Sequence, residues 1–167
     1  VHANNGLRVQ EFMIRPDGAR NFSDAMRICF LVIKSLSKII KIKGLSTSVG
    51  DEGGFAPMIN NNNQALDLIV TAIRKAGFVN GKDVSICLDV AANELYKKNK
   101  YSIHSKNYVS VEKCINEYKK MLKENLEVLV SFHNDSPIMI QLPNQVSCIV
   151  DMTDAALKGQ TVSSSYK

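Results

Sequence analysis

Two helical patterns follow one another between two strand patterns, over residues 7–90 of the chain. The strand patterns span residues 7–15 and 83–90, and in the second of them apolar and polar side chains alternate. Between them, apolar residues recur at helical spacing over 22–40 and again over 66–76. Strands that alternate with helices predict an α/β fold with parallel pairing. Two consecutive helices depart from a plain strand–helix alternation.

The ends of these helices are also marked in the sequence. Asn21 can cap the first helix, Gly44 can end it, and a polar tract at residues 60–63 can cap the second helix. The apolar stripe of the first helix is broad, which predicts cover on more than one side, as in a packed barrel layer.

The pattern continues for some forty residues beyond the second strand and then changes. We expect an irregular hairpin over residues 96–108 and a third helix over 111–124, capped by Ser110. From residue 131 the chain changes character, with short strand patterns at 138–142 and 146–150 and a final segment of disordered composition.

Composition is that of an ordinary globular protein, with 45% hydrophobic and 22% charged residues. The cysteines match no metal or redox pattern, and the sequence shows no secretory signal and no apolar run long enough to span a membrane. We therefore expect a cytoplasmic protein with reduced thiols. The net charge of +5 raises the question of nucleic acid. The basic residues follow helical faces without interleaved aromatic residues, which favours solvated faces.

Residues 49–57 read Val-Gly-Asp-Glu-Gly-Gly-Phe-Ala-Pro. Two adjacent carboxylates, Asp51 and Glu52, therefore lie in a frame of three glycines closed by Pro57. Glycine allows positive φ and a close approach of the backbone to a ligand, and proline fixes the exit of the loop. Taken alone, such a segment would be an acidic surface turn.

Four separated segments, this loop among them, together resemble enolase (phosphopyruvate hydratase) in the order and at about the spacing of that family. The other three are His-Ala-Asn-Asn at 2–5, Gln-Glu-Phe-Met-Ile at 10–14 and Leu-Asp-Val-Ala-Ala-Asn-Glu at 88–94. The resemblance covers residues 1–130 and implies a partial, incomplete TIM-like barrel of the enolase type, in which two helices also follow one another. Residues 131–167 would be a divergent or frame-shifted tail, poorly ordered.

The resemblance implies the dehydration of 2-phosphoglycerate to phosphoenolpyruvate in glycolysis. In that family a lysine removes the proton α to the carboxylate, Mg²⁺ stabilises the enediolate, and an acid helps hydroxide to leave. The α-proton beside an ionised carboxylate is so weakly acidic that cations must stabilise the developing charge. The resemblance also implies a homodimer in the intact family, whose members are cytoplasmic and occur at the cell surface as well.

Residue by residue, Glu52 matches the proton donor to the leaving hydroxyl and Glu11 the acid that works beside it. Gln10 matches a substrate contact, His2 a mobile-loop histidine that closes over the phosphate, and Asp89 the first magnesium ligand, at the end of a strand. Strict alternation puts Gln10 and Glu11 on opposite faces, so both reach one site only at a strand end or bulge. The structural alternatives are a polar pair on an edge strand, a helix cap at Asp89 and a frayed, unused His2.

The remaining parts of the family's site have no clear counterpart. No residue matches the base lysine. In the segments that correspond most nearly to the family's second and third magnesium ligands, the only candidate carboxylates are Asp135 and Asp151. Because a complete barrel takes roughly 250 residues, we expect the chain to be inactive alone and prone to associate. Turnover of 2-phosphoglycerate within about tenfold of an intact enolase would contradict this expectation. The alternative function is a non-catalytic, basic α/β fragment that binds a protein partner or nucleic acid.

Overall fold

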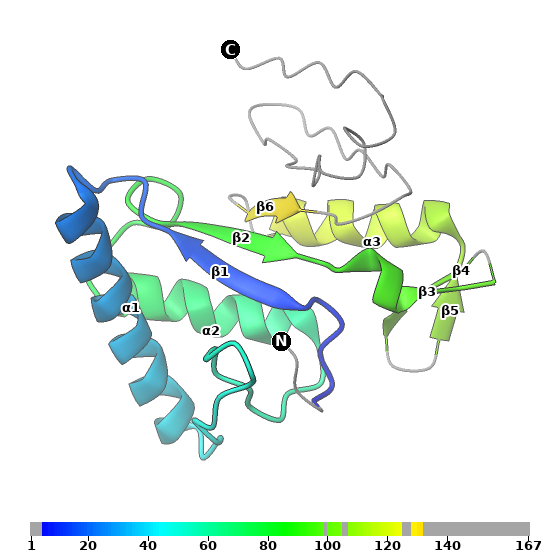
Figure 1. The fold of residues 1–167 in the computed structure, drawn as a ribbon, viewed down its shortest axis with the longest axis horizontal. Helices are drawn as coiled ribbons and strands as arrows, with labels where there is room; N and C mark the ends of the chain where they lie inside the picture. Colours follow the sequence, from blue (N-terminus) through cyan, green and yellow to red (C-terminus); the bar gives the residue numbers. More distant parts are fainter. Residues whose placement is uncertain (1–4, 99, 105–106, 125–127, 132–167) are drawn as a thin grey trace, which may run out of the picture.

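The computed structural model describes residues 5–98, 100–104, 107–124 and 128–131, and the account that follows is confined to them. These residues form a mixed arrangement of helices and strands (Figure 1), with no closed barrel in the described ranges. His2, Asp135, Asp151 and the strand patterns at 138–142 and 146–150 lie outside them, as does nearly all of the tail.

The main sheet has the strand order β1-β2-β6. Strand β1 spans Glu11–Arg15, β2 spans Ser85–Asp89 and β6 spans Val128–Ser131. Strand β6 pairs with β2 in parallel, whereas β1 pairs with β2 antiparallel, so the predicted parallel pairing is wrong for β1 and β2.

The polarity of β1 and β2 follows from the number of helices between them. Helices α1 (Phe22–Ile42) and α2 (Asn62–Lys75) both lie between the two strands in sequence. Figure 1 shows α2 running in the same direction as β1, so the chain leaves α2 near the end of β1 and enters β2 in the opposite direction. A single long helix, α3 (Val111–Glu124), precedes β6 and restores the parallel direction.

The first strand begins at Glu11 rather than at residue 7, because the preceding residues pack elsewhere. The backbone N–H of Arg8 donates to Oδ1 of the buried Asn62, at 3.4 Å. Gly6 lies so close to the same segment that a Cβ there would be 2.7 Å from the carbonyl oxygen of Ile59. Residues 6–8 are therefore held against the start of α2 and cannot join the sheet.

The predicted helix caps are confirmed. Oδ1 of Asn21 accepts from the N–H of Asp24 at 2.9 Å, and Oδ1 of Asn61 accepts from the N–H of Gln64 at 2.7 Å. Gly44 follows α1 with a φ of 70°, the left-handed conformation that ends many helices.

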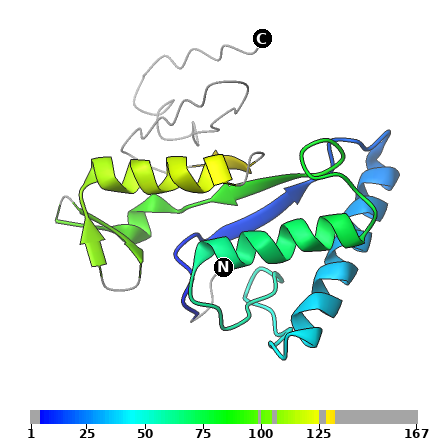
Figure 2. The ribbon, with the colours of Figure 1, turned by 180° about the vertical axis from the view of Figure 1, so that it is seen from behind.

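The core lies on one face of the main sheet. Helices α2 and α3 both lie behind that sheet in Figure 1 and in front of it in the reversed view of Figure 2, so they cover the same face. On that face Val84, Ile86 and Leu88 are fully buried, whereas Cys87 and Asp89 point to the other face, as the alternation predicted. The result is a two-layer α/β arrangement with its second sheet face uncovered by any described helix.

Helix α1 does not have the cover on several sides that its broad stripe predicted. Its buried residues Ile28, Val32 and Ile39 belong to the same core cluster as the buried residues of α2, while a second apolar stripe remains exposed. The exposed side chains are Phe22 (80%), Met26 (55%), Phe30 (58%) and Ile33 (47%). Among the described helices and strands, α2 makes the extensive contacts with α1, and this stripe lies away from them. None of the described helices is long and apolar enough to span a membrane.

The predicted hairpin is a small antiparallel sheet of three strands, β3 (Tyr96–Lys97), β4 (Lys100–His104) and β5 (Asn107–Val109). A short 3₁₀-helix, η1 (Ala92–Leu95), connects it to β2. Helix α3 follows, and Oγ of Ser110 accepts from the backbone N–H of Lys113 at 3.3 Å, which confirms the predicted cap.

Burial of Cys114 in α3 gives the fold a predicted pH dependence. Burial, with Glu117 nearby, raises the pKa of this thiol to about 11. The folded state therefore holds the proton more tightly than the unfolded state, and this stability is complete below pH 9 and lost as the pH rises toward 11. We expect the free energy of unfolding to fall by up to about 2 kcal/mol over that interval.

Urea denaturation at several pH values measures this effect. The variant Cys114→Ala has no thiol to titrate and should lose less stability above pH 9 than the unsubstituted chain. Equal losses in the two proteins would contradict the assignment to Cys114.

Candidate functional site

Glu11 and Asp89 are direct neighbours across two strands. Glu11 is the first residue of β1 and Asp89 the last of β2, and the antiparallel register places them opposite one another. Opposed residues in such a pair have Cβ atoms roughly 4.5–5.5 Å apart, on the same face of the sheet. Both side chains are half-buried. The structure thus brings together two carboxylates that the sequence had assigned from distant segments.

Gln10 lies at the end of a strand. It directly precedes β1 and is half-buried, so it lies at a strand end, where strict alternation no longer applies. Because β1 and β2 are antiparallel, the start of β1 and the carboxyl end of β2 meet at one edge of the sheet. Gln10 and Glu11 can therefore both reach the region beside Asp89.

The carboxylate pair lies on the sheet face that the described helices leave open. The same register places Met13 opposite Cys87 and Arg15 opposite Ser85 on this face. Met13 is 41% exposed, which shows that the face is accessible near its centre. A ligand can approach Glu11 and Asp89 from this side.

Asp89 also shapes the chain that leaves β2. Its Oδ1 accepts a hydrogen bond from the backbone N–H of Ala91 at 3.0 Å, two residues on. Ala91 has a φ of 45°, in the left-handed region, which for a residue with a Cβ costs about 1 kcal/mol or more. The turn fixes the orientation of the Asp89 carboxylate. Because this hydrogen bond uses Oδ1, Asp89 can cap the turn and still bind a ligand.

Ala91 is a residue of the site region that sequence reasoning missed. The pattern of an aspartate two residues before a turn is a weak signal for such a hydrogen bond. Alanine gives no sign that its backbone has positive φ, because this conformation favours glycine or asparagine. Strained backbone of this kind often occurs at functional sites.

The acidic loop is a tight turn between α1 and α2. Val49 and Phe55 form an antiparallel bridge, and the N–H of Gly50 donates to the carbonyl of Gly54 at 2.9 Å. Gly53 has a φ of 81°, which meets the expectation that glycine provides positive φ here. The turn presents Glu52 as an exposed side chain.

Convergence of Glu52 with the Glu11–Asp89 pair stays a prediction. Among the residues that the structure describes, no group of three His, Cys, Asp or Glu side chains could together hold a metal ion. The structure therefore joins two of the three predicted carboxylates, and Glu52 remains on a separate loop.

The carboxylate pair suits Mg²⁺ in its chemistry. Magnesium prefers oxygen ligands and is commonly held by one or two carboxylates, with water and substrate oxygens completing its shell. Asp89, with its carboxylate oriented by the turn at Ala91, can supply such a ligand. The described residues thus fit part of a magnesium site.

The glycines of the acidic loop offer a matched test of its geometry. A Cβ at Gly53 or at Gly54 would meet open space, but only Gly53 has positive φ. We therefore expect Gly53→Ala to lower the free energy of unfolding by about 1 kcal/mol. Gly54→Ala should change it by less than about 0.5 kcal/mol.

Urea denaturation of the two variants makes this comparison. Equal effects of the two substitutions would show that the left-handed turn at Gly53 does not form in solution.

Helices on one face of a sheet and carboxylates at a strand end are features of α/β barrel enzymes, whose chemistry lies at the strand ends. Residues 1–142 match the family described as "Enolase, C-terminal TIM barrel domain", and the chain belongs to this family. The resemblance found in the sequence is thereby confirmed.

One enolase shows how similar the chain is to members of this family in sequence. The chain is 75% identical over 124 residues to the enolase of Pelagibacter ubique (strain HTCC1062). This match covers 74% of the chain and 30% of the relative, so the chain spans less than a third of the length of the enolase that it matches.

Proposed function

We propose that this chain provides the first part of an enolase active site, which in the intact protein dehydrates 2-phosphoglycerate to phosphoenolpyruvate in glycolysis. The observation that carries the proposal is the direct opposition of Glu11 and Asp89 at one edge of the sheet. Family membership and 75% identity to a named enolase support it.

In this proposal each assigned residue has one task. Asp89 would be the first ligand of Mg²⁺, whose positive charge would stabilise the negative charge that develops when the α-proton is removed. Glu52 donates a proton to the leaving hydroxyl, and Glu11 works beside it. Gln10 contacts the substrate, and His2 closes over its phosphate.

The geometry of the chain supports this division of tasks. Asp89 and Glu11 lie on regular strands, which hold their carboxylates in a fixed relation. Glu52 lies on a short exposed turn, which suits a group that must approach a bound substrate. No residue of this chain matches the lysine that removes the α-proton, so we propose that the chain alone does not turn over.

A segment replacement tests the proposed function. The matched 124-residue segment of the Pelagibacter enolase is exchanged for that of this chain, and formation of phosphoenolpyruvate is followed by absorbance. We expect kcat/KM within about tenfold of the parent enzyme, a loss of less than about 1.4 kcal/mol of transition-state stabilisation. A folded replacement enzyme with a loss above about a thousandfold would overturn the proposal.

We also propose that the intact protein is a homodimer, and that the isolated chain self-associates through the exposed stripe of α1. Phe22, Met26 and Phe30 recur every fourth residue and so lie along one side of the helix. Burying such side chains contributes about 1.5–3 kcal/mol each, enough to drive association of an otherwise soluble fragment.

Sedimentation velocity measures this association. The unsubstituted chain should sediment as a dimer or larger species, and the variant Phe22→Ser/Met26→Ser/Phe30→Ser as a monomer. The measurement is made at a concentration of about 100 μM, where an association free energy of about 6 kcal/mol is enough to form dimers. An unsubstituted chain that stays monomeric at this concentration would contradict the assignment.

A further inference from the structure

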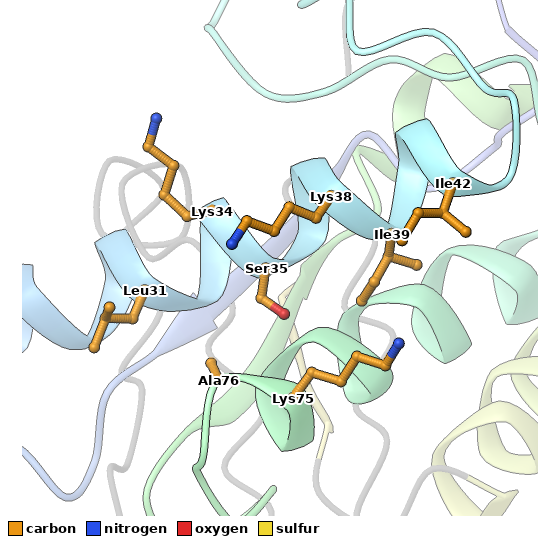
Figure 3. Close-up of a pocket in the computed structure, with 8 residues that line it drawn as sticks. All are labelled: Leu31, Lys34, Ser35, Lys38, Ile39, Ile42, Lys75 and Ala76. Carbon is orange, nitrogen blue, oxygen red and sulfur yellow. The ribbon is translucent and has the colours of Figure 1, made fainter.

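A groove with a volume of about 410 Å³ lies between α1 and the end of α2. Figure 3 shows Lys38 on the α1 side and Lys75 on the α2 side, with Ser35 pointing toward α2. The apolar lining consists of Leu31, Ile39, Ile42 and Ala76. The α1 residues of the lining extend from position 31 to position 42, roughly 16 Å along the helix axis. The groove is thus long, apolar along its lining and basic on both sides.

The lysines of the groove have no ion-pair partner among the described residues. Neither Lys38 nor Lys75 forms a salt bridge with any of the described residues. A third lysine of the lining, Lys34, lies with its Nζ 5.5 Å from the centre of the Phe30 ring. Residues 25–50 and 68–82, which contain the lining, include no Asp or Glu. This charge favours an acidic occupant.

The chemistry of the lining argues against a compact phosphate. Protein sites for phosphate commonly use backbone N–H groups at helix N-termini or the fork of an arginine. Here the lining residues of α1 lie inside a helix, where their N–H groups bond within the helix, and α2 contributes its C-terminal end, which carries partial negative charge. The lysines of this groove stand apart from one another beside apolar side chains. They therefore suit several carboxylates distributed along a partner better than one compact phosphate group.

We propose that this groove binds an acidic amphipathic helix of a partner protein. Such a helix would place apolar side chains against Leu31 and Ile42 and its carboxylates beside Lys38 and Lys75. The length of the groove matches about three helical turns. A second copy of this chain does not supply that ligand from its described helices, because α1, α2 and α3 each contain more basic than acidic side chains.

The test uses a fluorescent peptide of about 15 residues, with leucines at helical spacing and glutamates on both sides of them. Its binding to the full chain is measured by fluorescence anisotropy. In the variant Lys34→Glu/Lys38→Glu/Lys75→Glu we expect affinity to fall by at least about tenfold. The matched control is Lys97→Glu/Lys98→Glu/Lys100→Glu, which changes the net charge equally at exposed positions of the β3–β4 hairpin.

The proposal requires the control variant to bind within about threefold of the unsubstituted chain. A scrambled peptide of the same composition, which cannot place its leucines on one side, should bind at least about tenfold more weakly. Circular dichroism of both variants verifies that they are folded. No binding by the unsubstituted chain, equal losses in the two lysine variants, or equal binding of the scrambled peptide would each overturn the proposal.

Discussion

Glu52→Gln in the segment-replaced enolase is expected to lower kcat by about 10²–10⁴-fold, the usual contribution of a general acid. Glutamine keeps the size of the side chain and its capacity for hydrogen bonds, but it has no proton to give to the leaving hydroxyl. KM for 2-phosphoglycerate should change little, because the substitution removes an interaction made in the transition state. Steady-state kinetics at saturating Mg²⁺ separates the two parameters.

Glu112→Gln is the matched control, because Glu112 is also an exposed glutamate but lies in the first turn of α3. It should leave kcat within about twofold. A Glu52→Gln enzyme with the same small change would remove Glu52 from the catalytic assignment. Equal rises in KM for both variants would indicate a general electrostatic effect instead.

Leu66→Ala is expected to lower the free energy of unfolding by about 2–5 kcal/mol. Leu66 is fully buried in α2, in the core that supports β2 from behind. Removing three carbon atoms there leaves a cavity in addition to the lost burial. Urea denaturation followed by circular dichroism measures the change.

Leu31→Ala provides the comparison, because it makes the same substitution within a helix at a residue that is 36% exposed. We expect a loss of about 1 kcal/mol or less. Should the two variants lose equal stability, α2 would not pack in solution as it does in this structure.

Much of the local structure could be predicted because it depends on local chemistry. Asn21 and Ser110 cap helices through side-chain oxygens that reach the next turn, and Gly44 ends α1 with positive φ. The alternation in β2 separated its buried residues from Cys87 and Asp89. The assignment of Glu11 and Asp89 to one site came from the family resemblance, and the strand register agrees with it.

The features that could not be predicted depend on contacts between residues far apart in the sequence. The start of β1 depends on the contact between Gly6 and Ile59, far apart in sequence. The exposure of Phe22 and Phe30 depends on which elements pack against α1. Helical periodicity shows which side chains share one side of the helix, but it does not show whether another element covers that side. Positive φ at Ala91 is imposed by its surroundings against the preference of alanine.

The pairing of β1 with β2 also has a kinetic consequence. Residues 11 and 89 become neighbours only after the intervening chain, with both of its long helices, has closed into a loop. Such a closure carries an entropic penalty and slows folding, whereas the helices themselves form within microseconds. We therefore expect the two carboxylates to meet late in folding. A polypeptide emerging from the ribosome would then acquire its helices long before Glu11 and Asp89 come together.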